Sequence, residues 1–455
     1  MRASLLWITT LVSLAGPLVA CGSEFSSGSG GSGPGGTGVG AGGAGAGGSG
    51  TGAGGTGVGA GGAGAGGAQG GSGGSGGNEP PVCDVLLSGA TDLYVDQRFQ
   101  GQSPTGTETC PFQTINAGVD RALQLGGTIT IHVAGSTPAL TYAEPDRVIV
   151  RPNITLAGDG EAFVHVSASG TCASDPCAVH VLPGGKLRGV TVLTPATNGN
   201  GILAGPTVAP AVAPVVSHVA VVEVQGNGIL AFGALELGPG VVASHNGTGT
   251  NSGCGVLIHG PGRLHVLAPN GHPNLFNANH LHGIDVLDGA ELAFEGGETR
   301  DNLDDGIRLD PLSAQPPLAH TVVSLTATGN THNGLAAYGG TLKLRASTLL
   351  QNGSDGLAFN YEATTSLDIG TPDEAGNNVF DGPTAATRNG RAGVFLCTVA
   401  GSDVQQAAEG DQWWTCPPTK GTANACNQAS LPQSDIVIAA GGATVADPLT
   451  CGYGP

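Results

Sequence analysis

The sequence predicts an all-β protein built as a parallel β-helix of roughly ten coils. The main observation is a Gly followed by an aliphatic residue that recurs at intervals of 22 to 37 residues. Turn-forming residues rather than long helical patterns lie between most of these points, so each interval suits one coil. The repeat starts at Gly201, Gly228, Gly255, Gly283, Gly306, Gly334, Gly356 and Gly393.

Each repeat carries a short strand with one apolar face. The first and third residues after the Gly are always apolar, whereas the residue between them varies and includes Asp285 and Arg308. This period of two indicates a strand with one buried face. The first residues should form one inward stack: Ile202, Ile229, Val256, Ile284, Ile307, Leu335, Leu357 and Val394.

The residue before each Gly belongs to a turn. Asn and Asp predominate there, and both tolerate left-handed backbone and bond to neighbouring backbone. Stacked coils would align these side chains in a ladder, which we call the turn ladder: Asn200, Asn227, Cys254, His282, Asp305, Asn333, Asp355 and Ala392. Leucine-rich repeats lack support because their Leu spacing is absent, and propeller blades are longer and more aromatic.

An amphipathic helix should close the first coil. Residues 111–125 place apolar side chains at helical spacing, and Gly126-Gly127 ends the pattern. Such a helix would cover apolar surface and unpaired backbone at the open end of the stack. We therefore assign residues 79–160 to an N-terminal cap with the first coils, residues 161–400 to coils, and residues 401–455 to a Cys-rich C-terminal cap.

The entrance region resembles a known family. The residues Asp92–Asp96, Gly106-Thr107, Pro111–Ile115 and Ile154–Gly158 are similar to a bacterial domain of unknown function that opens many pectin-lyase-like β-helix proteins. The resemblance covers about residues 92–160. It implies a right-handed β-helix and a cell-envelope or extracellular setting. It implies no reaction, because that family offers no established catalytic residues.

The N-terminus predicts export and a lipid anchor. Arg2 and a short apolar stretch from Leu5 to Leu14 fit a signal peptide over residues 1–20. The motif Leu18-Val19-Ala20-Cys21 resembles a bacterial lipobox, which implies cleavage before Cys21 and its lipidation. An ordinary secreted protein is the alternative. Residues 21–78 are rich in Gly, Ala and Ser and should form a disordered tether.

Charge and composition exclude several classes of partner. The chain has 83 Gly without a collagen period, and a formal net charge of −19. Nucleic acid binding needs clustered Lys and Arg, so it is not expected. The expected partners are a membrane, through Cys21, and a polysaccharide or another surface protein. The expected location is the bacterial cell envelope, at the outer membrane or cell surface.

The cysteines suggest four disulfides. After Cys21 is set aside, Cys172 and Cys177 close a short loop and Cys83 and Cys110 flank the entrance segment. Four more lie towards the C-terminal end, Cys397, Cys416, Cys426 and Cys451, for which a zinc site is the alternative. Cys254 is expected to stay a buried thiol in the turn ladder.

The most enzyme-like cluster lies in two adjacent repeats. The candidates for glycan hydrolysis or β-elimination are Asp304, Asp305, Arg308 and His282, and such a set also suits Ca²⁺. A structural interpretation explains them as turn residues, with Asp285 and Arg308 as an exposed ion pair. The sequence favours this interpretation, with no metal and no cofactor. It therefore favours a structural, adhesive or glycan-binding protein over the alternative, a polysaccharide lyase or hydrolase.

Overall fold

The computed structural model describes 83, 88–172, 175–194, 199–206, 212–248, 253–268, 271–310, 318–361, 366–382, 384–398, 408, 411–413, 419–423 and 433–439. The predictions for residues 1–20, Cys21, the tether, Cys416, Cys426 and Cys451 lie outside these ranges. Among the described residues, no helix is long and apolar enough to cross a membrane.

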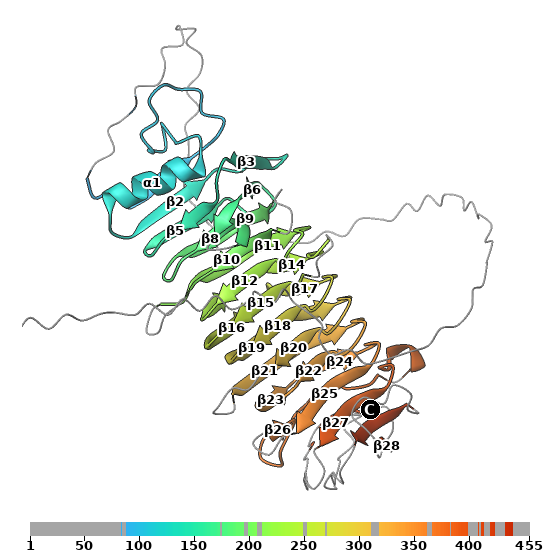
Figure 1. Ribbon diagram of the computed structural model, residues 1–455. Coiled ribbons are helices and arrows are strands. Elements are labelled where there is room, and N and C mark those ends of the chain that lie inside the picture. Colours follow the sequence, from blue (N-terminus) through green and yellow to red (C-terminus); the bar gives the residue numbers. More distant parts are fainter. Residues whose placement is uncertain are drawn as a thin grey trace, which may run out of the picture. The chain divides into compact units, whose positions relative to one another are not determined.

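The described residues form a stack of strands that pair in parallel, apart from the short antiparallel pair of β7 with β8, and Figure 1 shows successive coils side by side. We call the 13-stranded sheet that holds the repeated Gly motif the repeat sheet. Its strands, in spatial order, are β28 (Lys420–Ala423), β29 (Ser434–Ala439), β27 (Ala392–Thr398), β25 (Asp355–Tyr361), β22 (Leu335–Ala337), β20 (Ile307–Asp310), β18 (Ile284–Leu287), β15 (Val256–His259), β12 (Ile229–Phe232), β10 (Asn200–Ala204), β8 (Asp175–Val181) and β4 (Val148–Val150), with β7 (Gly170–Cys172) beside β8.

The second sheet supplies the remaining faces of the coils, and its main path has eleven strands. These are β1 (Asp92–Val95), β2 (Ile129–Val133), β5 (Ile154–Gly158), β9 (Lys186–Leu193), β11 (Val215–Val222), β13 (Leu235–Leu237), β16 (Gly262–Leu267), β19 (Ala290–Arg300), β21 (Ala319–Thr328), β23 (Thr341–Arg345) and β26 (Ser366–Asp368). Its side branches are β3 (Leu140–Glu144), β6 (Val164–Ala168), β14 (Val242–Ser244), β17 (Leu275–Asn277) and β24 (Thr348–Leu350). A short 3₁₀ helix, η1 (Ala385–Thr387), precedes β27.

The strand register confirms the predicted inward stack. Ile202 pairs with Ile229, and the pairing continues coil by coil to Val394. All eight predicted side chains are at most 1% exposed. Fully burying such a side chain contributes about 1.5–3 kcal/mol, so this column is a main source of the folding free energy.

Helix α1 (Ile115–Leu125) starts four residues later than the predicted segment. The Thr114 side chain caps it by accepting from the Ala117 N–H at 3.2 Å. The buried carboxylate of Glu144 accepts from the Ile115 N–H at 2.6 Å. It thereby satisfies another N–H of the first turn that has no partner within the helix. Ile115, Val119 and Ala122 join the core of the coils, as expected of a cap.

A second Asn ladder lies inside the coils and was not predicted. Each Asn donates its backbone N–H and its side-chain amide to the Oδ1 of the Asn in the next coil. We call this the inner ladder: Asn246, Asn279, Asn302, Asn330, Asn352 and Asn389, all at most 2% exposed. It ends on Asp381, whose Oδ1 accepts from Asn389 in the same way. Five of these residues stand four positions before a repeated Gly, so the signal was present in the sequence.

The outer side of the repeat sheet is also buried in places, contrary to expectation. Leu203, Leu230 and Leu257 occupy the variable strand position, yet each is at most 4% exposed. They form a second apolar cluster with Cys172, Cys177 and Cys254. Pointing away from the inward stack is therefore not enough to expose a residue at this position to solvent.

The structure confirms two predicted disulfides, Cys83–Cys110 and Cys172–Cys177. Cys397 is also disulfide-bonded. Cys254 is a buried thiol, as predicted.

Candidate functional site

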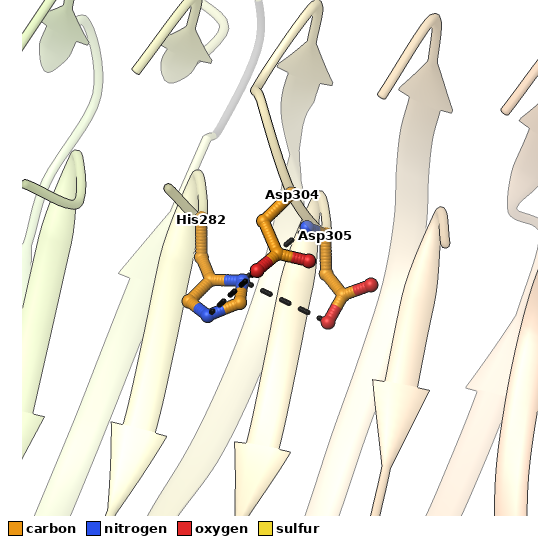
Figure 2. A group of neighbouring side chains, drawn as sticks. All are labelled: His282, Asp304 and Asp305. Carbon is orange, nitrogen blue, oxygen red and sulfur yellow. Dashed lines mark hydrogen bonds and ion pairs between the residues drawn. The ribbon is translucent and has the colours of Figure 1, made fainter. Parts of the chain in front are cut away.

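The candidate residues come together where three strands of the repeat sheet begin. Ile284 of β18 pairs with Ile307 of β20, which pairs with Leu335 of β22. This register places His282 beside Asp305 and Asp285 beside Arg308, as the alignment predicted. Figure 2 shows His282 at the start of one strand and both aspartates at the start of the next.

His282 is a buried, neutral histidine. Its side chain is 3% exposed, and burial lowers its pKa to about 4. Its Nδ1 accepts from the Asp305 backbone N–H at 3.3 Å, and its Nε2 lies 3.4 Å from Arg308 Nη1. Nε2 is 3.9 Å from Asp304 Oδ2. The neutral ring thus packs between the two aspartates and beside the Arg308 guanidinium.

Asp305 is a member of the turn ladder and also a buried acid. Its Oδ1 accepts from the Asn333 N–H at 3.0 Å and from Asn333 Nδ2 at 2.8 Å. Burial and the neighbouring Asp304 raise its pKa to about 7. The predicted turn role is therefore correct, and this group in addition titrates near neutral pH.

Asp304 contacts a histidine that the sequence analysis missed. Asp304 Oδ1 lies 2.5 Å from Nδ1 of His332, whose side chain is 60% exposed. The hydrogen bond to Asp304 raises the pKa of His332, while burial works against it. For Asp304, burial favours the neutral acid, but the contact with His332 lowers its pKa overall. The result is an Asp–His pair whose histidine is accessible.

Arg308 connects the cluster to its other carboxylates. Its Nη2 donates to Asp310 Oδ2 at 2.7 Å, and its Nε lies 3.9 Å from Asp285 Oδ1. Burial opposes the charge of Arg308, but Asp285 and Asp310 raise its pKa overall. The guanidinium also lies 5.9 Å from the ring centre of Tyr338, a partly exposed residue.

The predicted exposed ion pair is wrong. Asp285 is 0% exposed, and the side chain of Arg308 is 19% exposed. The variable strand position is thus buried at Asp285, as it is at Leu257 in the preceding coil. Removing one partner should therefore be costly.

Simple alignment would have found both missed residues. His332 stands two positions before Gly334, as Asp304 stands two before Gly306. Tyr338 stands four positions after Gly334, as Asp310 stands four after Gly306. The backbone confirms the first correspondence, since the His332 N–H donates to the Asp304 carbonyl.

A metal ion is poorly suited to this cluster. Ligand atoms of His282, Asp304 and Asp305 lie within 4.8 Å of one another. However, Nδ1 of His282 already accepts a backbone N–H, and Nε2 lies 3.4 Å from Arg308 Nη1. The guanidinium charge would repel a cation at Nε2. The arrangement suits proton transfer better than metal binding.

Comparisons with known proteins identify the fold. No protein-family model matches the chain, and no curated protein does. The A-module of mannuronan C-5 epimerase AlgE4 from Azotobacter vinelandii matches with a TM-score of 0.50 and 16% identity, over 78% of this chain and all of that one. The AlgE6 A-module of the same organism has a TM-score of 0.44 and 16% identity, over 73% and 94% of the two chains. Pectate lyase Pel9A has a TM-score of 0.38 and 13% identity, over 72% and 80%.

The chain is a right-handed parallel β-helix protein, as predicted. At this level of identity the likeness concerns the fold. The resemblance of residues 92–160 to a bacterial domain of unknown function stays a prediction.

Proposed function

We propose that this chain is a polysaccharide-active enzyme of the pectin-lyase-like superfamily, in which His332 exchanges a proton with a bound glycan. The observation that carries the proposal is the contact between Asp304 and the accessible ring of His332. An imidazole held by a carboxylate at one nitrogen can transfer a proton at the other. The shared fold with a mannuronan epimerase module supports a glycan as substrate by analogy.

The surrounding residues have distinct roles in this proposal. Asp304 is a positioning residue, because it holds Nδ1 of His332 and so leaves Nε2 for the glycan. Buried beneath them, His282 and Asp305 hold the turn that carries Asp304. Arg308 and the partly exposed Tyr338 border the same cluster and can contact sugar hydroxyls and ring faces.

A non-catalytic structural, adhesive or glycan-binding protein is the second candidate. Its supporting observation is that Asp305 occupies a regular position in the turn ladder and bonds to Asn333 there. On this view the cluster serves folding alone. The two candidates differ in what the loss of His332 does, since this exposed ring contributes little to the core.

The experiment compares wild type with His332→Ala on a panel of polysaccharides, measuring release of reducing and unsaturated ends. His280→Ala is the matched control, because His280 is an exposed histidine two coils earlier. We expect His332→Ala to lose about 10²–10⁴-fold in turnover at an unchanged melting temperature, while the control keeps its activity. Equal turnover by both variants would remove His332 from the mechanism, and no wild-type turnover would favour the second candidate.

We also propose that the enzyme is held at a bacterial cell envelope by lipid on Cys21, at the outer membrane or cell surface. The lipobox-like residues Leu18–Cys21 support this location. Replacing Cys21 with Ser should release the protein into the soluble fraction and abolish uptake of labelled fatty acid. A variant that stays membrane-bound, with an unlabelled wild type, would contradict the anchor.

A further inference from the structure

The cations of the candidate site are already matched by carboxylates. Arg308 donates to Asp310 at 2.7 Å and lies 3.9 Å from Asp285, and His332 is held by Asp304 at 2.5 Å. A fourth carboxyl group, on Asp305, lies in the same cluster, 3.7 Å from His282 Nδ1. The cluster therefore has more acidic than basic groups, and both of its cations have acidic partners.

The next cation along the same edge of the repeat sheet is also engaged. Arg391 donates through Nε to Asp355 Oδ1 at 2.9 Å, and its guanidinium lies 3.9 Å from the ring centre of Phe395. A substrate carboxylate or sulfate would have to displace one of these internal partners. It would also approach Asp304 and Asp310, which would repel it.

We infer that the glycan taken by this site lacks acidic groups, and that the site cleaves it by hydrolysis. The inference rests on the proposed function. Uncharged hydroxyls can donate to Asp304 and Asp310 without repulsion, and amino groups would be attracted. The partly exposed ring of Tyr338 offers a face for the apolar side of a sugar.

The reaction class follows from the substrate class. β-Elimination removes a proton next to a carboxyl group of the sugar, so a glycan without that group cannot react in this way. Hydrolysis needs a proton donor and a base. His332 gives the Nε2 proton to the glycosidic oxygen as the C–O bond breaks, water attacks the anomeric carbon, and the proton that this water loses passes to the solvent.

The test measures binding of the full-length chain to acidic, neutral and amino-bearing polysaccharides. The probes are polygalacturonate and alginate on one side, and galactan, β-glucan and chitosan on the other. We expect the preferred non-acidic glycan to bind at least about tenfold more tightly than either acidic one. Its products should carry reducing ends and no unsaturated ends.

A charge variant makes the test specific to this site. Asp310→Asn frees Arg308 from its closest partner, so binding of polygalacturonate or alginate should strengthen relative to the preferred glycan. Asp288→Asn is the matched control, because Asp288 is an exposed carboxylate paired with His259 outside the cluster. It should leave the ratio of affinities unchanged.

The outcomes separate the two proposals. Tightest binding of an acidic glycan, or release of unsaturated ends, would overturn the present inference and leave the proposed function standing. An unchanged affinity ratio in Asp310→Asn would also overturn it. Absence of any binding or cleavage by the wild type would overturn both.

Discussion

Asp304 Oδ1 and His332 Nδ1 lie 2.5 Å apart although 28 positions separate the two residues in the chain. Parallel stacking brings them together, because each stands two residues before a repeated Gly in adjacent coils. Any two residues that stand at the same distance from the repeated Gly in adjacent coils lie side by side in this way. The identity of the two side chains then decides whether they form an acid–base pair such as Asp304 and His332.

The first prediction concerns the titration of His332. Asp304→Asn removes the anion that raises the pKa of this ring, so the pKa of His332 should fall. The stabilisation from the pair is full below the unfolded pKa of about 6.5 and is lost as pH rises through the higher folded value. NMR titration of the ring in both proteins checks the shift. An identical pKa in the variant would contradict the pairing.

The second prediction concerns Arg308. Arg308→Ala leaves Asp285 buried beside the lost charge, and we expect a loss of about 3–5 kcal/mol in the free energy of unfolding. Asp285→Asn combined with Arg308→Ala should recover part of this loss, since the buried carboxylate that Arg308 faced is then replaced by a neutral amide. Urea unfolding of the two single variants and the double variant measures the coupling. A loss below about 1 kcal/mol in Arg308→Ala would restore the exposed-pair interpretation.

The third prediction concerns the inner ladder. Asn302 donates from its backbone and side chain to Asn330 Oδ1 and from its side chain to the Phe276 carbonyl, and its Oδ1 accepts from Asn279. Asn302→Ala leaves several buried polar groups without hydrogen-bond partners, and each such group lowers the free energy of unfolding by about 1–3 kcal/mol. We expect it to destabilise the protein far more than Asn227→Ala in the half-buried part of the turn ladder. Similar melting temperatures for both variants would contradict this ranking.

The fourth prediction concerns Asp411, which ends a further short ladder. Its Oδ1 accepts from the N–H and the Nδ2 of Asn378, whereas its Oδ2 is buried without a hydrogen bond in the described part of the chain. Burial raises the pKa of Asp411 to about 7. Since the folded pKa lies above the unfolded value, the protein should lose stability as pH rises from about 4 to about 7.

Asp411→Asn removes that titration while keeping an acceptor for Asn378. The variant should be more stable than wild type at pH 8, by an amount on the order of a few kcal/mol, and nearly equal to it at pH 4. Thermal unfolding at the two pH values provides the measurement. A difference that does not change with pH would show that Asp411 is not the titrating group.

The fold and the register were readable from the sequence alone. The Gly motif and the alternating apolar residues define each strand, because only one phase of a two-residue period buries Ile202 through Val394 together. The turn ladder and two disulfides were likewise predictable from spacing. The inner ladder and His332 carried equally regular signals that alignment on the same Gly would have revealed.

Burial and charge state were decided by the tertiary structure. The alignment placed Asp285 beside Arg308, but it did not reveal that the outer position of β18 is buried. An exposed pair was therefore expected where a buried pair occurs. The charge state of Asp305 was likewise not predictable. The sequence identified it as a turn residue, whereas burial and the neighbouring Asp304 raise its pKa to about 7. Register is a property of a short period along the chain, whereas desolvation depends on every segment that packs around a group.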